Sequence, residues 1–293
     1  MAEGRKSPFR WRRVKKEDLP LTERLLKDRE PYCVAACARF LHPKGGRDHL
    51  WFLRRETPAG PKSGGNIAAL LLFSRRSLFP IRIGAGEMPP PPFMNSLLRR
   101  ATVHAVQGLR KEVITMETLL SGLGFRAVED IDYDLMALDR EPCPASFNRG
   151  PPALILRQPG TGDEENLYRL QAAYEQEEVL PRGAVFNALS CRRSLEHILS
   201  REHILVAELY GRIVGKINTS ASSFSRYQIG GVYVDPDYRG LGIACRMAAV
   251  FARELIREGR GLSLFVKKRN AAARAVYRRI GFEVLEDYRI GYY

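Results

Sequence analysis

The feature that most constrains the fold is a glycine-containing segment, residues 232–244, which reads VYVDPDYRGLGIA and joins an apolar strand to an amphipathic helix. Pro236 ends the strand because it has no N–H group to donate to a neighbouring strand. Gly240 and Gly242 allow a tight turn, and the helix predicted from Ile243 begins with unsatisfied N–H groups and a positive dipole end. We therefore expect successive amides to point into one concavity that suits a diphosphate.

Arg239 stands at the start of this turn and can add charge-assisted hydrogen bonds to an anion. The pattern R-x-x-G-x-A is weak by itself, and an ordinary strand-to-helix loop is the alternative interpretation. It is not a Walker loop, since no Gly-Lys-Ser/Thr follows, and it lacks the third glycine of a dinucleotide-binding fingerprint.

A second candidate segment runs from the strand Leu264–Lys267 to a helix that begins after Asn270. Asn270 is well placed to cap that helix. Tyr277 lies two turns further on, so the two side chains share a face with Ala273 between them. Taken singly, Asn270 can be a cap and nothing more, and Tyr277 a half-buried core aromatic.

The C-terminal half reads as a regular succession of elements. Periodicity predicts strands at 153–157, 204–209, 213–218, 228–234, 262–266 and 288–293, and helices at 164–178, 190–200, 243–258 and 271–280. This order predicts an α+β fold with helices packed on both faces of a mixed β-sheet.

The N-terminal half is less regular. Residues 1–16 read as a basic, mobile arm; helices are predicted at 19–28, 31–41, 93–107 and 111–120, a strand pair at 67–73 and 78–83, a strand at 133–138, and loops at 57–66 and 84–92. Pro, Gly and Ser enrich residues 139–152 as in an interdomain linker. We therefore divide the chain into an arm (1–16), an N-terminal α+β domain (17–140), a linker (141–152) and a C-terminal domain (153–293).

The two halves share a short echo. Residues 123–130 (LGFRAVED) parallel residues 280–287 (IGFEVLED), and Gly124 and Gly281 lie 157 residues apart. In both copies a predicted helix ends at the glycine and a strand follows. The match favours two tandem domains that arose from a diverged duplication.

On these residues the C-terminal half, from about Ala153 to Tyr293, resembles the GNAT superfamily of N-acetyltransferases. The resemblance implies a GNAT-like fold and acetyl-coenzyme A as cofactor, with Tyr277 as general acid and Glu177 or Glu178 as the base that accepts the amine's proton. Glu208 is a third candidate base. The residues that the resemblance places around the cofactor are Val232, Tyr233, Val234, Arg239, Gly240, Leu241, Gly242, Ile243, Ala244, Asn270, Ala273 and Tyr277.

The resemblance implies direct attack of a primary amine on the thioester. The N-terminal half has no loop that matches residues 239–244, and we interpret it as a degenerate GNAT-like domain, or an unrelated one, that does not bind the cofactor. A non-catalytic acyl-coenzyme A sensor and a nucleic-acid- or partner-binding protein on the same scaffold are the alternatives. The acceptor is left open between a small amine, a protein amine and an aminoacyl group.

The overall composition limits the partners and the cellular location that we expect for this chain. The formal charge of +14 favours anionic partners, and Phe9 and Trp11 within the basic arm would suit RNA or an acidic partner. The five scattered cysteines and the absence of a leader-like or membrane-length apolar run predict a cytoplasmic protein with reduced thiols, no metal and no membrane partner.

Overall fold

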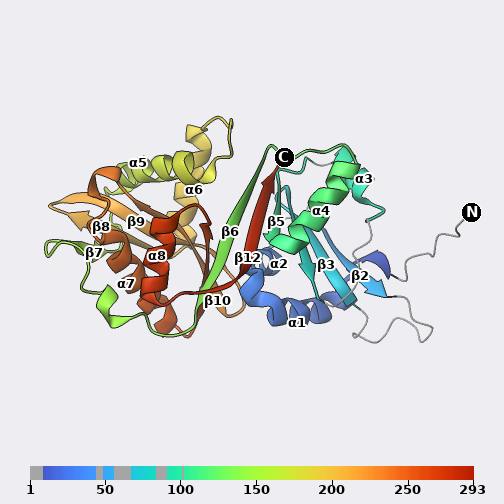
Figure 1. The fold of residues 1–293 in the computed structure, drawn as a ribbon, viewed down its shortest axis with the longest axis horizontal. Coiled ribbons are helices and arrows are strands. Elements are labelled where there is room, and N and C mark those ends of the chain that lie inside the picture. Colours follow the sequence, from blue (N-terminus) through green and yellow to red (C-terminus); the bar gives the residue numbers. More distant parts are fainter. Residues whose placement is uncertain (1–8, 44–48, 56–66, 84–90, 101) are drawn as a thin grey trace, which may run out of the picture. The chain divides into compact units, whose positions relative to one another are not determined.

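A computed structural model of the protein describes residues 9–43, 49–55, 67–83, 91–100 and 102–293 (Figure 1). The chain forms two compact units. Unit 1 comprises Met1–Asp132 together with Asp287–Tyr293, and unit 2 comprises Tyr133–Glu286. No helix in the described ranges is long and apolar enough to cross a membrane.

In the described residues, unit 1 is a six-stranded mixed sheet with helices. Its strands, in the order β1-β2-β3-β4-β5-β12, are β1 (Phe9–Arg13), β2 (His49–Arg55), β3 (Ile67–Ser74), β4 (Ser77–Arg82), β5 (Ala105–Leu109) and the end of β12 (Glu283–Tyr292). Its helices are α1 (Leu19–Arg29), α2 (Val34–Leu41), α3 (Met94–Arg100) and α4 (Arg110–Gly122). Every residue of β3 is buried, since both of its faces are covered.

Unit 2 repeats this plan. Its sheet has the order β6-β11-β10-β9-β8-β7, built from β6 (Glu129–Leu138), β7 (Ile155–Arg157), β8 (Ile204–Leu209), β9 (Arg212–Ser222), β10 (Arg226–Val234) and β11 (Gly261–Lys267). Its helices are α5 (Glu164–Tyr174), α6 (Ala188–Arg201), α7 (Ile243–Arg257) and α8 (Ala271–Ile280). Met247, Phe251 and Leu255 recur every four residues along α7 and are buried in the core beneath it.

The two units have the same element order, strand-helix-helix-strand-strand-strand-helix-strand-helix, which confirms the tandem α+β fold. In both, the glycine of the echo adopts a positive φ, 88° at Gly124 and 116° at Gly281. The strand that follows each glycine completes the sheet of the other unit. Tyr133–Leu138 of β6 pair with β11, whereas Tyr288–Tyr292 of β12 pair with β5, where the red β12 lies beside β5 in Figure 1.

The structure therefore differs from the expected division of the chain at two points. The expected boundary at residue 140 places β6 in the N-terminal domain, and the expected C-terminal domain includes the end of the chain. In the structure, residues 133–138 of β6 belong to unit 2 and residues 287–293 belong to unit 1. Residues 141–152 also pack within unit 2 and are not a free linker, since the Cys143 N–H donates to Ile280 O at 2.8 Å and Ser146 is buried.

Two local predictions in unit 1 were wrong, and one strand was missed. Phe9–Arg13 is a strand paired with β2 and not a mobile arm, because Trp11 packs on Phe93 and pairs with Leu53. The helix expected at 93–107 ends at Arg100, and Ala105–Leu109 forms β5. Strand β2 was not predicted. The loop predicted at 57–66, residues 84–90 of the loop predicted at 84–92, and residues 1–8 of the arm lie outside the described residues.

Candidate functional site

A groove of about 640 Å³ opens in unit 2. Every residue expected at the cofactor and catalytic positions lines it: Glu177, Glu178, Val232, Tyr233, Val234, Arg239, Gly240, Leu241, Gly242, Ile243, Ala244, Asn270, Ala273 and Tyr277. Three separate parts of the sequence, residues 177–178, 232–244 and 270–277, are thereby brought together. The third candidate base, Glu208, is not in the lining and pairs instead with Arg157 at 2.7 Å.

The floor of the groove is a gap between two parallel strands. Strands β10 and β11 pair from Arg226 opposite Gly261 to Ile229 opposite Leu264, and the paired register stops there although both strands continue. At the same point β10 makes an irregularity against β9 between Gly230 and Tyr233. Residues 232–234 therefore have no strand partner on the β11 side.

A buried polar cluster holds this irregularity. Gly231 has a φ of +58°, and its carbonyl accepts a hydrogen bond from Lys216 Nζ at 3.0 Å. Lys216, which is fully buried, also donates to Asn218 Oδ1 at 2.9 Å. The Gly231 N–H donates to the Tyr174 hydroxyl at 3.3 Å. A side chain at residue 231 would collide with Asn218, so only glycine fits.

The turn after β10 has the conformation that the sequence predicts. Asp235 is buried and caps the short 3₁₀ turn Pro236–Tyr238, while Gly240 and Gly242 have φ values of 79° and 82°. Within the described residues, the backbone N–H groups of residues 240–244 have no protein acceptor. These amides at the N-terminus of α7 form a cradle that fits an anionic diphosphate.

Arg239 is held by the protein itself. Its guanidinium makes two hydrogen bonds to Glu177 at 2.9 and 2.8 Å, and its Nε donates to Val234 O at 3.0 Å. The Tyr233 hydroxyl also donates to Glu177 at 3.0 Å. The hydrogen bonds from Arg239 lower the pKa of Glu177, which makes this carboxylate a weaker base. The structure thus favours Glu177 as the partner that orients Arg239 over the expected role as base.

Glu178 points to a different set of groups. A π-helical turn at Glu175–Val179 follows α5, and within it Glu178 pairs with Lys267 at 2.9 Å and accepts from Asn270 Nδ2 at 3.4 Å. Such turns are frequent at functional sites. Beside it lies a hollow of about 430 Å³ that is also lined by Glu177, Arg269, Ala271 and Ala272. Glu178 therefore borders both the groove and an open space for a second molecule.

Tyr277 and Asn270 occupy one face of α8, as the spacing predicts. Asn270 caps the helix by accepting from the Ala273 N–H at 3.0 Å. Tyr277 is buried, and its ring packs edge-on against Phe282 at 5.8 Å. Burial, and then the charges of Tyr174 and Glu178, raise the pKa of the Tyr277 hydroxyl. This hydroxyl is therefore protonated at neutral pH and able to donate a proton.

Sequence reasoning missed several groups at this site: Asn148, Arg149 and Gly150, Tyr174, Lys216, Asn218 and Arg279. The sequence does contain an indication of Lys216 and Asn218, because they lie in the apolar strand IVGKIN and a lysine is almost never fully buried unless it is paired. The residues at 148–150 had none, because only the folded chain brings them to the groove.

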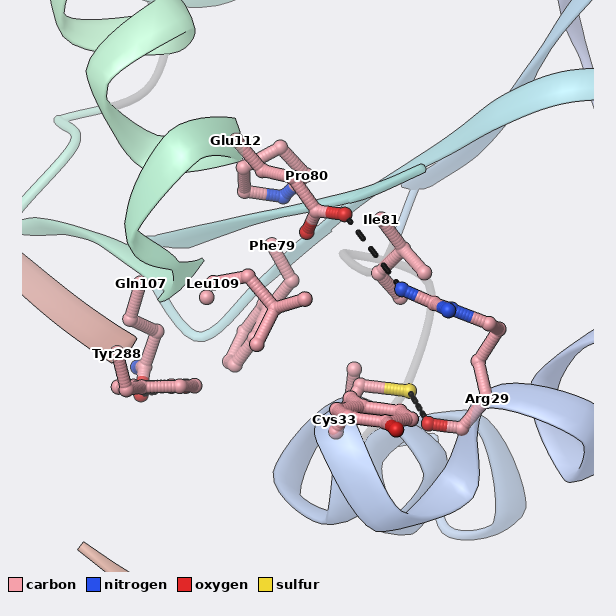
Figure 2. Close-up of a pocket in the computed structure, with 12 residues that line it drawn as sticks. Arg29, Cys33, Phe79, Pro80, Ile81, Gln107, Leu109, Glu112 and Tyr288 are labelled. Carbon is pink, nitrogen blue, oxygen red and sulfur yellow. Dashed lines mark hydrogen bonds and ion pairs between the residues drawn. The ribbon is translucent and has the colours of Figure 1, made fainter. Parts of the chain in front are cut away.

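Among the described residues of unit 1, the place equivalent to this groove holds only a small cavity. Strands β4 and β5 pair only at Ser77–Leu78, and where they part the cavity is about 10 Å³, which is room for roughly one water. Figure 2 shows Glu112 and Arg29 linked across this cavity, with Phe79 and Tyr288 among the side chains that fill it. Between these strands the described residues leave only this water-sized space.

Comparisons with known proteins agree with the fold. Residues 164–282 match the model of the acetyltransferase (GNAT) family. A search of curated proteins returned no significant match. Among solved structures, a Drosophila protein is 14% identical (TM-score 0.62, covering 97% of this chain and 98% of that one). A GCN5-related N-acetyltransferase from Sphaerobacter thermophilus is 22% identical (0.57, 97% and 94%). A tandem GNAT protein from the clavulanic acid biosynthesis pathway is 12% identical (0.55, 97% and 98%).

Proposed function

We propose, on the premise that residues 164–282 form a GNAT acetyltransferase domain, that the protein moves an acetyl group from acetyl-coenzyme A to a primary amine. The observation that carries this proposal is the row of N–H groups at 240–244, which have no protein acceptor in the described structure and lie in one groove with Tyr277. When bound, the cofactor supplies an activated thioester for direct attack by the amine.

The residues of the groove fit the parts of that cofactor. The amides at 240–244 would hold the diphosphate, and Gly242 keeps that turn free of side-chain atoms. The backbone of Val232–Val234 has no strand partner on the β11 side and would pair there with the amide-containing arm, except at Val234 O, which accepts from Arg239 Nε. Because the Asp235 N–H donates to Val214 on β9 at 2.8 Å, strand alternation turns the Val234 N–H to the open side, where it can stabilise developing negative charge.

Two side chains would move protons. Tyr277 has a protonated hydroxyl in the groove and is the proposed donor to the departing sulfur. Glu178 is the proposed acceptor of the amine's proton, directly or through water, since it borders the groove and the neighbouring hollow. Glu177 is already occupied by Arg239 and Tyr233 and takes no proton in this proposal.

The test is the replacement of Tyr277 by phenylalanine. We expect the turnover number, measured as thiol release from acetyl-coenzyme A with a panel of amines, to fall about 100-fold, because a general acid typically contributes at least that factor. Cofactor affinity, measured by calorimetry, should change little. Tyr210→Phe is the matched control, since Tyr210 is exposed on a turn outside the groove.

Two outcomes would contradict the proposal. Binding of acetyl-coenzyme A without thiol release for any amine would favour the non-catalytic sensor. Unchanged turnover in Tyr277→Phe would remove the tyrosine from the mechanism while leaving acetyl transfer itself in place.

A further inference from the structure

Three arginines line the groove, and they are not equivalent. Arg239 is engaged by Glu177 through both terminal nitrogens. Arg149 and Arg279 also line it, and their guanidinium groups have no hydrogen-bond or ion-pair partner within the described residues. The positive charge left available to a ligand in this groove is therefore that of Arg149 and Arg279.

Arg149 is held at the groove by a segment that lies between β6 and β7. The backbone of Gly150 approaches Gly242 so closely that a Cβ on Gly242 would lie 3.0 Å from Gly150 N and 3.3 Å from Arg149 Cβ. The same segment is fixed by Ser146, whose hydroxyl donates to the carbonyl of Arg279 at 3.3 Å. Residues 148–150 thus form a wall of the anion cradle, and that wall is tied to the end of α8.

We infer that Arg149 and Arg279 bind the ribose 3′-phosphate of coenzyme A. The inference rests on the proposed function, which gives the diphosphate to the five amides at 240–244. The 3′-phosphate is the one other anionic group of that cofactor, and a phosphate monoester carries close to two negative charges at neutral pH. A guanidinium fork matches phosphate oxygens in two-point hydrogen bonds. The two arginines of the groove without carboxylate partners are the groups that remain to receive it.

The experiment compares two ligands that differ only at this position, coenzyme A and 3′-dephospho-coenzyme A. Their affinities for the full-length protein are measured by calorimetry, with wild type, Arg149→Gln and Arg279→Gln. Each variant should lose about tenfold in affinity for coenzyme A, the size expected for a hydrogen bond to a charged group. Neither should lose affinity for the dephospho form. Arg278→Gln is the matched control, because Arg278 is exposed on the same helix and does not line the groove.

The outcomes separate this inference from the proposed function. An equal loss for both ligands would assign the arginines to the diphosphate and overturn the inference, and no loss in either variant would overturn it as well. If wild type bound neither ligand, the proposed function itself would fail. The side chains replaced, Arg149, Arg278 and Arg279, are all exposed, so their replacement leaves the core intact.

Discussion

Replacing Lys216 with methionine would test whether the groove is supported by a lysine that folding has stripped of water. Lys216 is fully buried on β9 and donates to Asn218 Oδ1 and Gly231 O, while the Tyr174 ring lies 5.1 Å from its Nζ. Burial lowers its pKa from 10.5 to about 7, against the opposing attraction of Glu175. Methionine has a similar length and no charge to bury.

The magnitude follows from linkage. A lysine whose pKa is depressed in the folded state destabilises that state at low pH, where both states are protonated and the charge must be buried. As pH rises from 7 toward 10.5, the unfolded state still holds a proton that the folded state has released, so the cost declines and then vanishes. The shift corresponds to about 5 kcal/mol below pH 7. Between pH 7 and pH 9 the cost should fall by about 2 kcal/mol.

The assay is urea unfolding of wild type and Lys216→Met at pH 7, 8 and 9. The lost hydrogen bonds to Asn218 and Gly231 should lower the variant's stability by about 1–3 kcal/mol at each buried acceptor, at every pH. The ionisation cost is absent from the variant, so wild type should gain about 2 kcal/mol relative to it from pH 7 to pH 9. Lys111→Met, at an exposed lysine, controls for the loss of a surface charge. A wild-type-to-variant difference that stays constant across this range would refute the reasoning.

Two further predictions concern the backbone around the groove and the exchanged strands. Gly231→Ala should destabilise the protein by about 2 kcal/mol or more in thermal unfolding, because the φ of Gly231 is positive and the new methyl group would collide with Asn218. The control Gly211→Ala, at a positive φ but in open space, should lower the stability by only about 1 kcal/mol. Equal losses in the two variants would contradict the steric argument. Deleting residues 287–293 should make unit 1 sensitive to limited proteolysis, because β5 loses one of its two partner strands and the buried Tyr288 is removed. Protection of unit 1 equal to that in the full chain would argue against the exchange of strands.

Much of unit 2 could be predicted because its signals are local. Helix α8 has the predicted bounds, since its cap at Asn270 and its αL glycine at Gly281 lie in the sequence beside it. The turn at residues 239–242 follows from two glycines that can adopt positive φ. Tyr277 faces the groove because a spacing of seven residues returns a side chain to the same helix face.

Unit 1 was less predictable because short buried strands give ambiguous patterns. The apolar residues of 93–107 recur at helical spacing, yet Ala105–Leu109 is a strand paired with both β4 and β12. Phe9–Arg13 looks like a solvated basic arm, and its conformation as a strand depends on pairing with β2, which begins 36 residues after β1 ends. Pairing with distant residues decided both outcomes.

The sequence by itself therefore determined the elements of unit 2, the amide cradle after β10 and the side chains that face it, because capping, periodicity and glycine conformation act within one or two turns of the chain. Only the tertiary structure decided that β6 and β12 exchange sheets, that Lys216 lies beneath Gly231, that Arg239 is taken up by Glu177, and that Arg149 reaches the groove. Each of these depends on contacts between residues distant in sequence, which burial and hydrogen bonding select and which no local pattern encodes.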